Sequence, residues 1–205
     1  MTRPRPPAGT AGYAEVADRL LALVLPFEKT HAPVMHLMPG APAQVLDIGA
    51  GAGHDAAWLA DRGHDVVATE PEPTMLHGAR ELYVASRVEW LDDALPELPT
   101  LSSRDPQFDL VLISAVWMHL DRRSRQRAML VVAGFLRPGA RLILSLRHGP
   151  MPQGRRMFEV SPGETIAQAE GEGLTTILQA AAGSVQEVNI RAGVTWDWLA
   201  FERPS

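Results

Sequence analysis

Short runs of branched apolar residues alternate along the chain with longer segments in which apolar residues recur at helical spacing. Five of these runs are bounded by turn residues and predict strands at 45–48, 65–69, 87–91, 108–114 and 141–147. The segments between them have helical character at 56–63, 73–86 and 124–139. Strands that alternate with helices indicate βαβ units, so we expect an α/β fold with a mostly parallel sheet between two helical layers.

Two further apolar runs lie near the carboxyl end, at 175–181 and 194–201. About a dozen residues separate them, which is too few for another helical crossover between parallel strands. We therefore expect an antiparallel pair at the edge of the sheet, which makes the sheet mixed and seven-stranded. No repeat or linker divides residues 44–205, so they are predicted to form one core.

The amino-terminal residues precede this core. Residues 1–12 are rich in proline, glycine and threonine and are expected to form a flexible tail. From Tyr13 to about Leu25 the apolar residues have helical spacing. Residues 13–205 are therefore predicted to be a single domain that begins with a helical segment.

Composition narrows the class of protein. The apolar content of 46% and charged content of 21% are typical of globular proteins. No apolar run approaches the about 18 residues that a membrane span needs, and the first ten residues lack the apolar stretch of a secretory signal. Because cysteine is absent, disulfides, thiolate metal sites and cysteine nucleophiles are excluded. We expect a cytoplasmic protein without a metal centre, and the net charge of −5 disfavours nucleic acid as a partner.

A glycine-rich turn is the strongest local signal. The first predicted strand of the core runs into Gly49, Gly51 and Gly53, and a helix is expected from about Asp55. Glycines allow the backbone to turn sharply and to approach a ligand that a Cβ would obstruct. Such a ligand lies over the carboxyl edge of a doubly wound sheet. His54 stands where a dinucleotide fingerprint has its third glycine, so a bound pyrophosphate is not expected.

Acidic residues stand on both sides of this turn. Asp47 lies at the end of the first strand of the core, where it can accept hydrogen bonds. Glu70 ends the next strand, where a carboxylate can accept hydrogen bonds from both hydroxyls of a ribose. An acid, three glycines and a second acid at this spacing resemble the first two motifs of the class I S-adenosylmethionine-dependent methyltransferases. The alternative is a tight turn with solvated acids.

The resemblance extends from about Gln44 to Arg147. It implies a Rossmann-like doubly wound fold, S-adenosylmethionine as methyl donor and S-adenosylhomocysteine as product. Because the family commonly places amino-terminal additions over the cofactor cleft, residues 13–40 are expected to form a helical lid. The implied cofactor-binding residues are Asp47, Gly49, Ala50, Gly51, Gly53, Asp55, Glu70, Pro71, Asp93, Ala94, Ser114, Ala115 and Trp117. For the adenine contact, Asp93 followed by Ala94 fits best, and Asp92 is a rival.

Three histidines are candidates for a general base on the acceptor side. Methyl transfer is an in-line displacement from a sulfonium, so orientation and desolvation contribute to its rate, and a base helps when the acceptor is a hydroxyl or a protonated amine. His119 follows the fourth strand, His148 follows the fifth, and His31 lies in the lid. His119 is the preferred candidate, and a capping or packing role is its alternative.

Two pairs of charged residues complete the candidate acceptor site. Arg147 follows the fifth strand, and its planar fork of donors suits a carboxylate or phosphate, as do those of Arg155 and Arg156 in the next loop. The alternative is a salt bridge with a local acid such as Glu159. Glu28 and His31 are three residues apart, which places them on one face of a helix. They can orient or deprotonate an acceptor, unless they form an exposed pair of no consequence.

The sequence does not name the acceptor. The segment SAVW after the fourth strand is not an Asn/Asp-Pro-Pro-aromatic motif, so amino-group methylation of DNA bases is disfavoured. SAVWMHL and LRHGP resemble short stand-alone bacterial methyltransferases of the type 11/12 form. We expect O- or N-methylation of a small molecule. The alternatives are an RNA or protein methyltransferase that uses the basic face from Arg122 to Arg127, and a catalytically silent protein that binds the cofactor.

Overall fold

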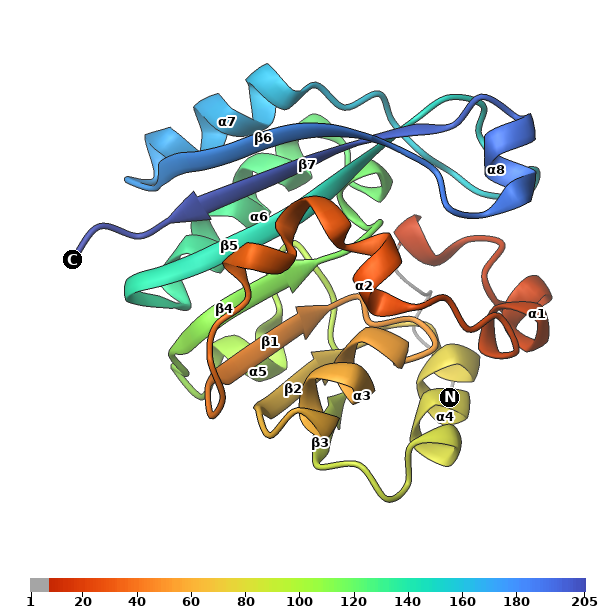
Figure 1. The fold of residues 1–205 in the computed structure, drawn as a ribbon, viewed down its shortest axis with the longest axis horizontal. Helices are drawn as coiled ribbons and strands as arrows, with labels where there is room; N and C mark the ends of the chain where they lie inside the picture. The colour runs from red at the N-terminus through yellow and green to blue at the C-terminus, as the bar shows by residue number, and fades with distance from the viewer. Residues whose placement is uncertain (1–7) are drawn as a thin grey trace.

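The computed structural model describes residues 8–205, and one seven-stranded sheet forms its centre (Figure 1). The strand order is β3-β2-β1-β4-β5-β7-β6. The strands are β1 (Gln44–Ile48), β2 (Asp65–Thr69), β3 (Val88–Leu91), β4 (Phe108–Ile113), β5 (Leu136–His148), β6 (Thr175–Gly183) and β7 (Thr195–Glu202). β1 to β5 are parallel, whereas β7 pairs antiparallel with both β5 and β6. The predicted mixed sheet and the antiparallel pair at its edge are both confirmed.

Helices cover both faces of the sheet, as predicted. Those that follow β1 are α3 (His54–Asp61), α4 (Pro73–Leu82), α5 (Pro99–Ser102), η4 (Trp117–His119), α6 (Arg122–Gly134), α7 (Pro162–Gly171) and α8 (Glu187–Arg191). Side chains at their starts fix several of these helices. The Asp121 carboxylate accepts the Ser124 N–H at 2.8 Å, and the Glu72 carboxylate accepts the Met75 N–H at 2.8 Å. Such caps satisfy backbone donors that have no partner within the helix.

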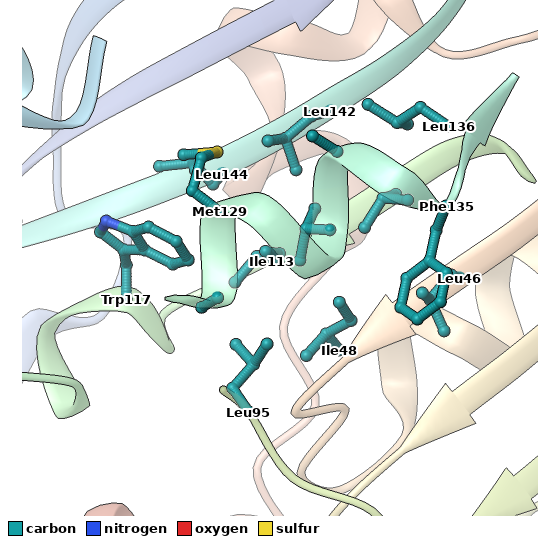
Figure 2. Packing of buried hydrophobic residues seen from close by; sticks show 14 of the residues in the cluster. Leu46, Ile48, Leu95, Ile113, Trp117, Met129, Phe135, Leu136, Leu142 and Leu144 are labelled. Atoms are coloured by element: carbon teal, nitrogen blue, oxygen red, sulfur yellow. The ribbon is translucent and has the colours of Figure 1, made fainter. Parts of the chain in front are cut away.

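Alternate residues of each central strand point to opposite faces of the sheet and so enter two separate apolar clusters. Leu46, Ile48 and Leu144 pack on the side of α6, together with Met129 (Figure 2). Their neighbours in the sequence enter the cluster on the side of α3, whose members include Val45, Leu59, Leu110, Leu112 and Ile143. No helix within residues 8–205 is long and apolar enough to cross a membrane.

The amino-terminal segment before β1 has two different environments. Its elements are η1 (Ala8–Thr10), η2 (Ala14–Val16), α1 (Ala17–Leu21), α2 (Phe27–Thr30) and η3 (Ala32–Leu37). Phe27 and Val34 are buried in the cluster on the α3 side, and Figure 1 shows this part of the segment lying across the sheet. The helix expected to about Leu25 ends at Leu21, and Leu23 is exposed. Of the expected tail, residues 1–7 lie outside the described residues.

Candidate cofactor and acceptor site

A cavity of about 960 Å³ lies at the carboxyl edge of the parallel strands. Each of β1 to β5 contributes residues that lie at or just after its carboxyl end. They are Gly49, Ala50 and Gly51 after β1, Glu70 and Pro71 after β2, Asp93 and Ala94 after β3, Ser114 and Ala115 after β4, and Arg147 of β5. This edge is where doubly wound folds bind ligands. A smaller hollow of about 210 Å³ shares Ala50, Ser114 and Ala115 with it.

The glycines of the turn serve two different purposes. Gly51 has φ 57°, and a Cβ added there would meet only the Met75 Cε, at 3.8 Å, so the residue faces open space in the cavity. Gly53 has φ 80°, but a Cβ there would lie 2.4 Å from the Trp90 ring. Gly53 does not line either hollow, because its side of the turn packs against β3. The predicted contact of Gly53 with the cofactor stays a prediction, and its observed contacts are with β3 and α4.

Glu70 is held with its carboxylate at the cavity. Its Oε2 accepts the Gly51 N–H and its Oε1 accepts the Glu72 N–H, both at 2.8 Å. Burial raises the pKa of Glu70 to about 7, although these two N–H groups oppose the shift. A buried carboxylate with this pKa gains from further hydrogen-bond donors, which favour its ionised form.

The pKa of Glu70 predicts how stability depends on pH. Between the usual pKa of 4.5 and about 7, the folded chain holds this proton and the unfolded chain does not, so the free energy of unfolding falls as pH rises. The difference corresponds to about 3 kcal/mol. Glu70→Gln should lack this component. The free energy of unfolding, measured with urea at pH 5 and pH 8, should therefore fall less between these pH values in the variant than in the parent. Equal losses would contradict the burial of an ionisable Glu70.

Asp47 and Asp55 occupy different places around the turn. Asp47 is buried in β1 and lines neither hollow, and its contact with the cofactor stays a prediction. Burial, followed by the charges of Asp55 and Glu70, raises its pKa well above the usual range. Asp55 lines the smaller hollow, where its Oδ2 lies 3.4 Å from His31 Nε2.

The structure distinguishes the two aspartates that were rivals for the adenine contact. Asp93 and Ala94 line the large cavity, whereas Asp92 is exposed and does not. Asp93 also organises its loop, because its carboxylate accepts the Leu101 N–H at 2.8 Å and the Ala94 N–H at 3.1 Å. The geometry favours Asp93, and its contact with adenine stays a prediction.

The loop after β4 borders the cavity through Ser114 and Ala115. Ala115 has φ 59°, a conformation unusual for a residue with a side chain, and its N–H donates to Ser145 Oγ at 2.9 Å. Ser145, which is buried in β5, was not predicted as a site residue. Trp117 was expected beside the cofactor, but it is fully buried in the apolar cluster of α6 (Figure 2).

His119 lies at the cavity in a defined hydrogen-bond network. Its Nδ1 is 2.9 Å from the Arg156 carbonyl oxygen, which can only accept, so the proton is on Nδ1. Its Nε2, 2.9 Å from the Tyr13 hydroxyl, therefore accepts the Tyr13 proton. Burial lowers the pKa of His119, which keeps the ring neutral, and raises the pKa of Tyr13. Tyr13 was not predicted as a site residue, since its partner lies 106 positions away.

The other acceptor candidates are divided by the structure. His31 is buried, stacks on Phe27 and lines the smaller hollow. Glu28 is exposed on another side of the segment, where it accepts from Trp58 Nε1 at 2.9 Å. His148 Nε2 lies 2.8 Å from Asp197 Oδ2, between β5 and β7. Neither Glu28 nor His148 lines a hollow, and a role for either at the acceptor stays a prediction.

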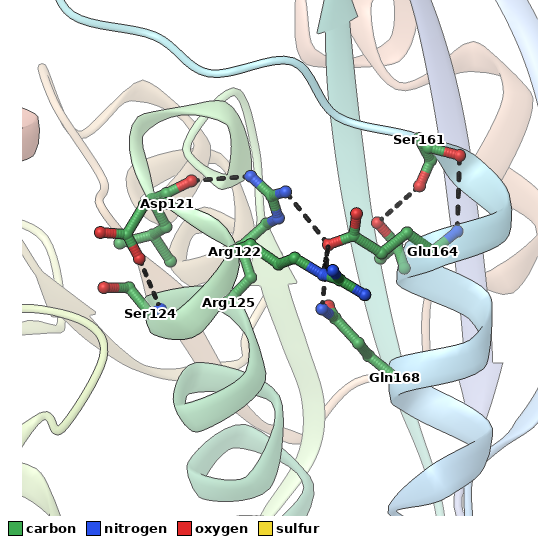
Figure 3. Close-up of polar contacts among 9 residues, drawn as sticks. Asp121, Arg122, Ser124, Arg125, Ser161, Glu164 and Gln168 are labelled. Carbon is green, nitrogen blue, oxygen red and sulfur yellow. Dashed lines mark hydrogen bonds and ion pairs between the residues drawn. The ribbon is translucent and has the colours of Figure 1, made fainter.

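The basic face of α6 is mostly engaged in internal contacts (Figure 3). Arg125 is buried and donates to Glu164 Oε1 at 3.1 Å, which joins α6 to α7. Arg122 lies 3.9 Å from the same carboxylate, and Arg127 lies 3.5 Å from Glu97. The buried pair of Arg125 has a structural role, whereas Arg122 and Arg127 are exposed.

Comparison with known proteins agrees with this geometry. Residues 45–139 match the family described as methyltransferase domain. Uncharacterized methyltransferases of Mycobacterium tuberculosis and Mycobacterium bovis are 41% identical over 106 residues, which are 52% of this chain and 40% of theirs. The chain thus matches less than half the length of these curated relatives.

Solved methyltransferases have the same fold at low sequence identity. A TehB-like S-adenosylmethionine-dependent methyltransferase of Corynebacterium glutamicum has TM-score 0.66 at 22% identity, covering 93% of this chain and 96% of its own. The N-methyltransferase NodS of Bradyrhizobium japonicum, in complex with S-adenosylhomocysteine, has TM-score 0.69 at 17% identity, covering 93% and 98%. The 1,6-didemethyltoxoflavin-N1-methyltransferase of Burkholderia thailandensis has TM-score 0.67 at 22% identity, covering 87% and 78%.

The fold is the Rossmann-like doubly wound fold that solved methyltransferases share. Residues 45–139 are thus similar to a methyltransferase domain, and the whole fold is that of solved S-adenosylmethionine-dependent methyltransferases, as the motifs predicted.

Proposed function

We propose that this protein transfers a methyl group from S-adenosylmethionine to an oxygen or nitrogen of a small molecule. The cavity is the main support. Its β1–β2 side carries Gly51 and Glu70, and its β4–β5 side carries His119 and Arg147. Its volume of about 960 Å³ is at the upper end of the about 300–1,000 Å³ of small-molecule sites, which leaves room for a cofactor and a small acceptor together.

The residues of the cavity suit these two tasks. S-adenosylmethionine supplies the electrophilic methyl group when bound. Glu70 accepts hydrogen bonds from the ribose hydroxyls, and Gly51 leaves the space that the cofactor needs. On the acceptor side, the Tyr13 oxygen takes the proton of a hydroxyl or ammonium acceptor as Tyr13 passes its own proton to His119 Nε2. Enclosure of the acceptor by the amino-terminal residues 8–25 excludes water.

The first experiment is calorimetry with S-adenosylmethionine and S-adenosylhomocysteine, followed by a screen of small-molecule acceptors with methyl-labelled donor. Failure to bind either compound would refute the proposal. The 1,6-didemethyltoxoflavin-N1-methyltransferase and NodS are both named as N-methyltransferases, so amines belong in that screen beside hydroxyls. A cytoplasmic location stays a prediction that cell fractionation tests.

Two other functions are less well supported. Methylation of RNA or protein needs a basic surface leading to the cavity, but Arg122, Arg125 and Arg127 are already paired with acids. A catalytically silent cofactor-binding protein needs no acceptor space, whereas this cavity extends to His119 and Arg147.

Glu70→Ala is expected to weaken S-adenosylhomocysteine binding by about 1.5–3 kcal/mol, the range for the loss of charge-assisted hydrogen bonds. Calorimetry on the folded variant measures this loss. Glu89→Ala is the matched control, because Glu89 is an exposed acid of β3 that pairs with Arg104 and does not line the cavity. Parent-like affinity in Glu70→Ala would overturn the ribose assignment.

A further inference from the structure

The β4–β5 side of the large cavity carries positive charge that no described carboxylate neutralises. Arg147 of β5 and Arg155 of the following loop both line the cavity. Arg147 donates to the Pro150 carbonyl oxygen at 2.8 Å. Neither guanidinium takes part in any of the ion pairs among residues 8–205, and the salt bridge considered with Glu159 does not form. Two arginines without acidic partners at a cavity wall are available to a ligand.

The described acids that line the same cavity form no ion pair with Arg147 or Arg155. Glu70 and Asp93 accept backbone N–H groups of the neighbouring loops. Glu187 pairs with Arg191 on α8. Arg19 adds a further positive charge to the lining, and His119 is neutral. The β4–β5 side of the cavity therefore keeps an excess of positive charge.

Arg155 is held in position by the amino-terminal segment. Its guanidinium carbon lies 4.3 Å from the centroid of the Tyr13 ring, and Tyr13 in turn bonds to His119. The backbones are in direct contact nearby, because a Cβ on Gly12 would lie 2.3 Å from the Gly154 carbonyl oxygen. A guanidinium fixed in this way loses little side-chain entropy when it binds an anion.

We propose that the acceptor is a small, partly apolar molecule with an oxyanion group, a carboxylate or a phosphate, and that Arg147 and Arg155 bind this group. The apolar part has its own contacts, since Leu120, Pro152 and Met157 line the same side. Burial, and then the charge of Arg155, lowers the pKa of Arg147, and a bound anion relieves both effects. The inference rests on the proposed methyltransferase function and narrows its substrate class.

The experiment uses the full chain saturated with S-adenosylhomocysteine and three probes of similar size. Phenylacetate and phenyl phosphate carry the two oxyanions, and phenylacetamide is their neutral counterpart. Ligand-observed NMR titrations should show at least one anion binding about tenfold more tightly than the amide, the effect of one charge-assisted hydrogen bond. The anion that binds more tightly shows whether the acceptor's oxyanion group is a carboxylate or a phosphate. Equal binding of anions and amide would overturn the inference.

Variants then locate the binding group. Arg147→Met and Arg155→Met should each remove most of the preference for the anion, and Arg147→Lys should restore part of it. Arg156→Met is the control, because Arg156 is exposed, lies over Phe158 at 5.0 Å and does not line the cavity. A similar loss in Arg156→Met would contradict the inference.

Calorimetry with S-adenosylhomocysteine separates this inference from the function on which it rests. The arginine variants should bind the cofactor product as the parent does. Weaker binding in Arg147→Met or Arg155→Met would mean that these residues hold the cofactor carboxylate, and would overturn the inference alone. A parent protein that does not bind S-adenosylhomocysteine would overturn the proposed function as well.

Discussion

Gly51→Val is expected to lower S-adenosylhomocysteine affinity more than about 100-fold, or about 2.7 kcal/mol, in a protein that remains folded. Gly51 faces the cavity, and the only atom near an added Cβ is the Met75 Cε at 3.8 Å. The valine methyl groups would occupy space that the cofactor needs. They would not clash with the core, so the variant should still fold. Calorimetry measures the loss, and a thermal melt reports whether the variant is folded.

A matched glycine separates obstruction from backbone strain. Gly139 has φ 78°, and a Cβ there would meet only the Ser205 Oγ at 3.8 Å. It lies in β5 and does not line the cavity. Gly139→Val therefore imposes a similar left-handed strain, of about 1–2 kcal/mol, without approaching the cofactor. Loss of stability with retained binding is expected for Gly139→Val. If Gly51→Val binds like the parent, the glycine turn does not contact the ligand.

The local sequence pattern was sufficient to predict the sheet and many of the residues on the β1–β3 side of the cavity. The strand runs, the turn from Gly49 to Gly53 and the acid Glu70 directly after β2 are each local features of the sequence. Parallel strands bring their carboxyl ends to one edge, so residues that follow successive strands meet there without further information. The positions of Gly51, Glu70 and Asp93 at the cavity follow from this rule.

Contacts between distant segments were not predictable in the same way. The Tyr13–His119 bond joins residues from an amino-terminal turn and the loop after β4, and no periodicity marks it. Trp117 follows β4 closely, as a cofactor-lining residue does, but packing turns its ring into the α6 cluster. Glu28 and His31 are three residues apart and were expected on one face of a helix. However, α2 has only 4 residues and ends before His31. The helix α7 was not predicted at all.

Removal of residues 1–40 is expected to unfold the protein. Residues 27–37 form part of the core, because Phe27 and Val34 are buried with Val45, Leu110 and Ile143. Loss of a buried phenylalanine side chain alone costs about 3–5 kcal/mol, and a domain of this kind has about 5–15 kcal/mol in total. The truncation also removes the Leu37 carbonyl oxygen that Arg141 contacts at 2.9 Å. Circular dichroism and gel filtration should show no cooperative, compact state.

Removal of residues 1–25 should have a different result, because this part borders the cavity more than it fills the core. It supplies Tyr13 and Leu23 to the lining, and its Leu21 packs against Gly78 of α4. The shorter truncation should fold with a lower melting temperature and bind S-adenosylhomocysteine. It should lose methyl transfer, because the acceptor side is then open to water and His119 Nε2 lacks the Tyr13 hydroxyl. A shorter protein that transfers methyl groups at the parent rate would rule out the role of residues 8–25. A folded protein lacking residues 1–40 would show that residues 27–37 are not part of the core.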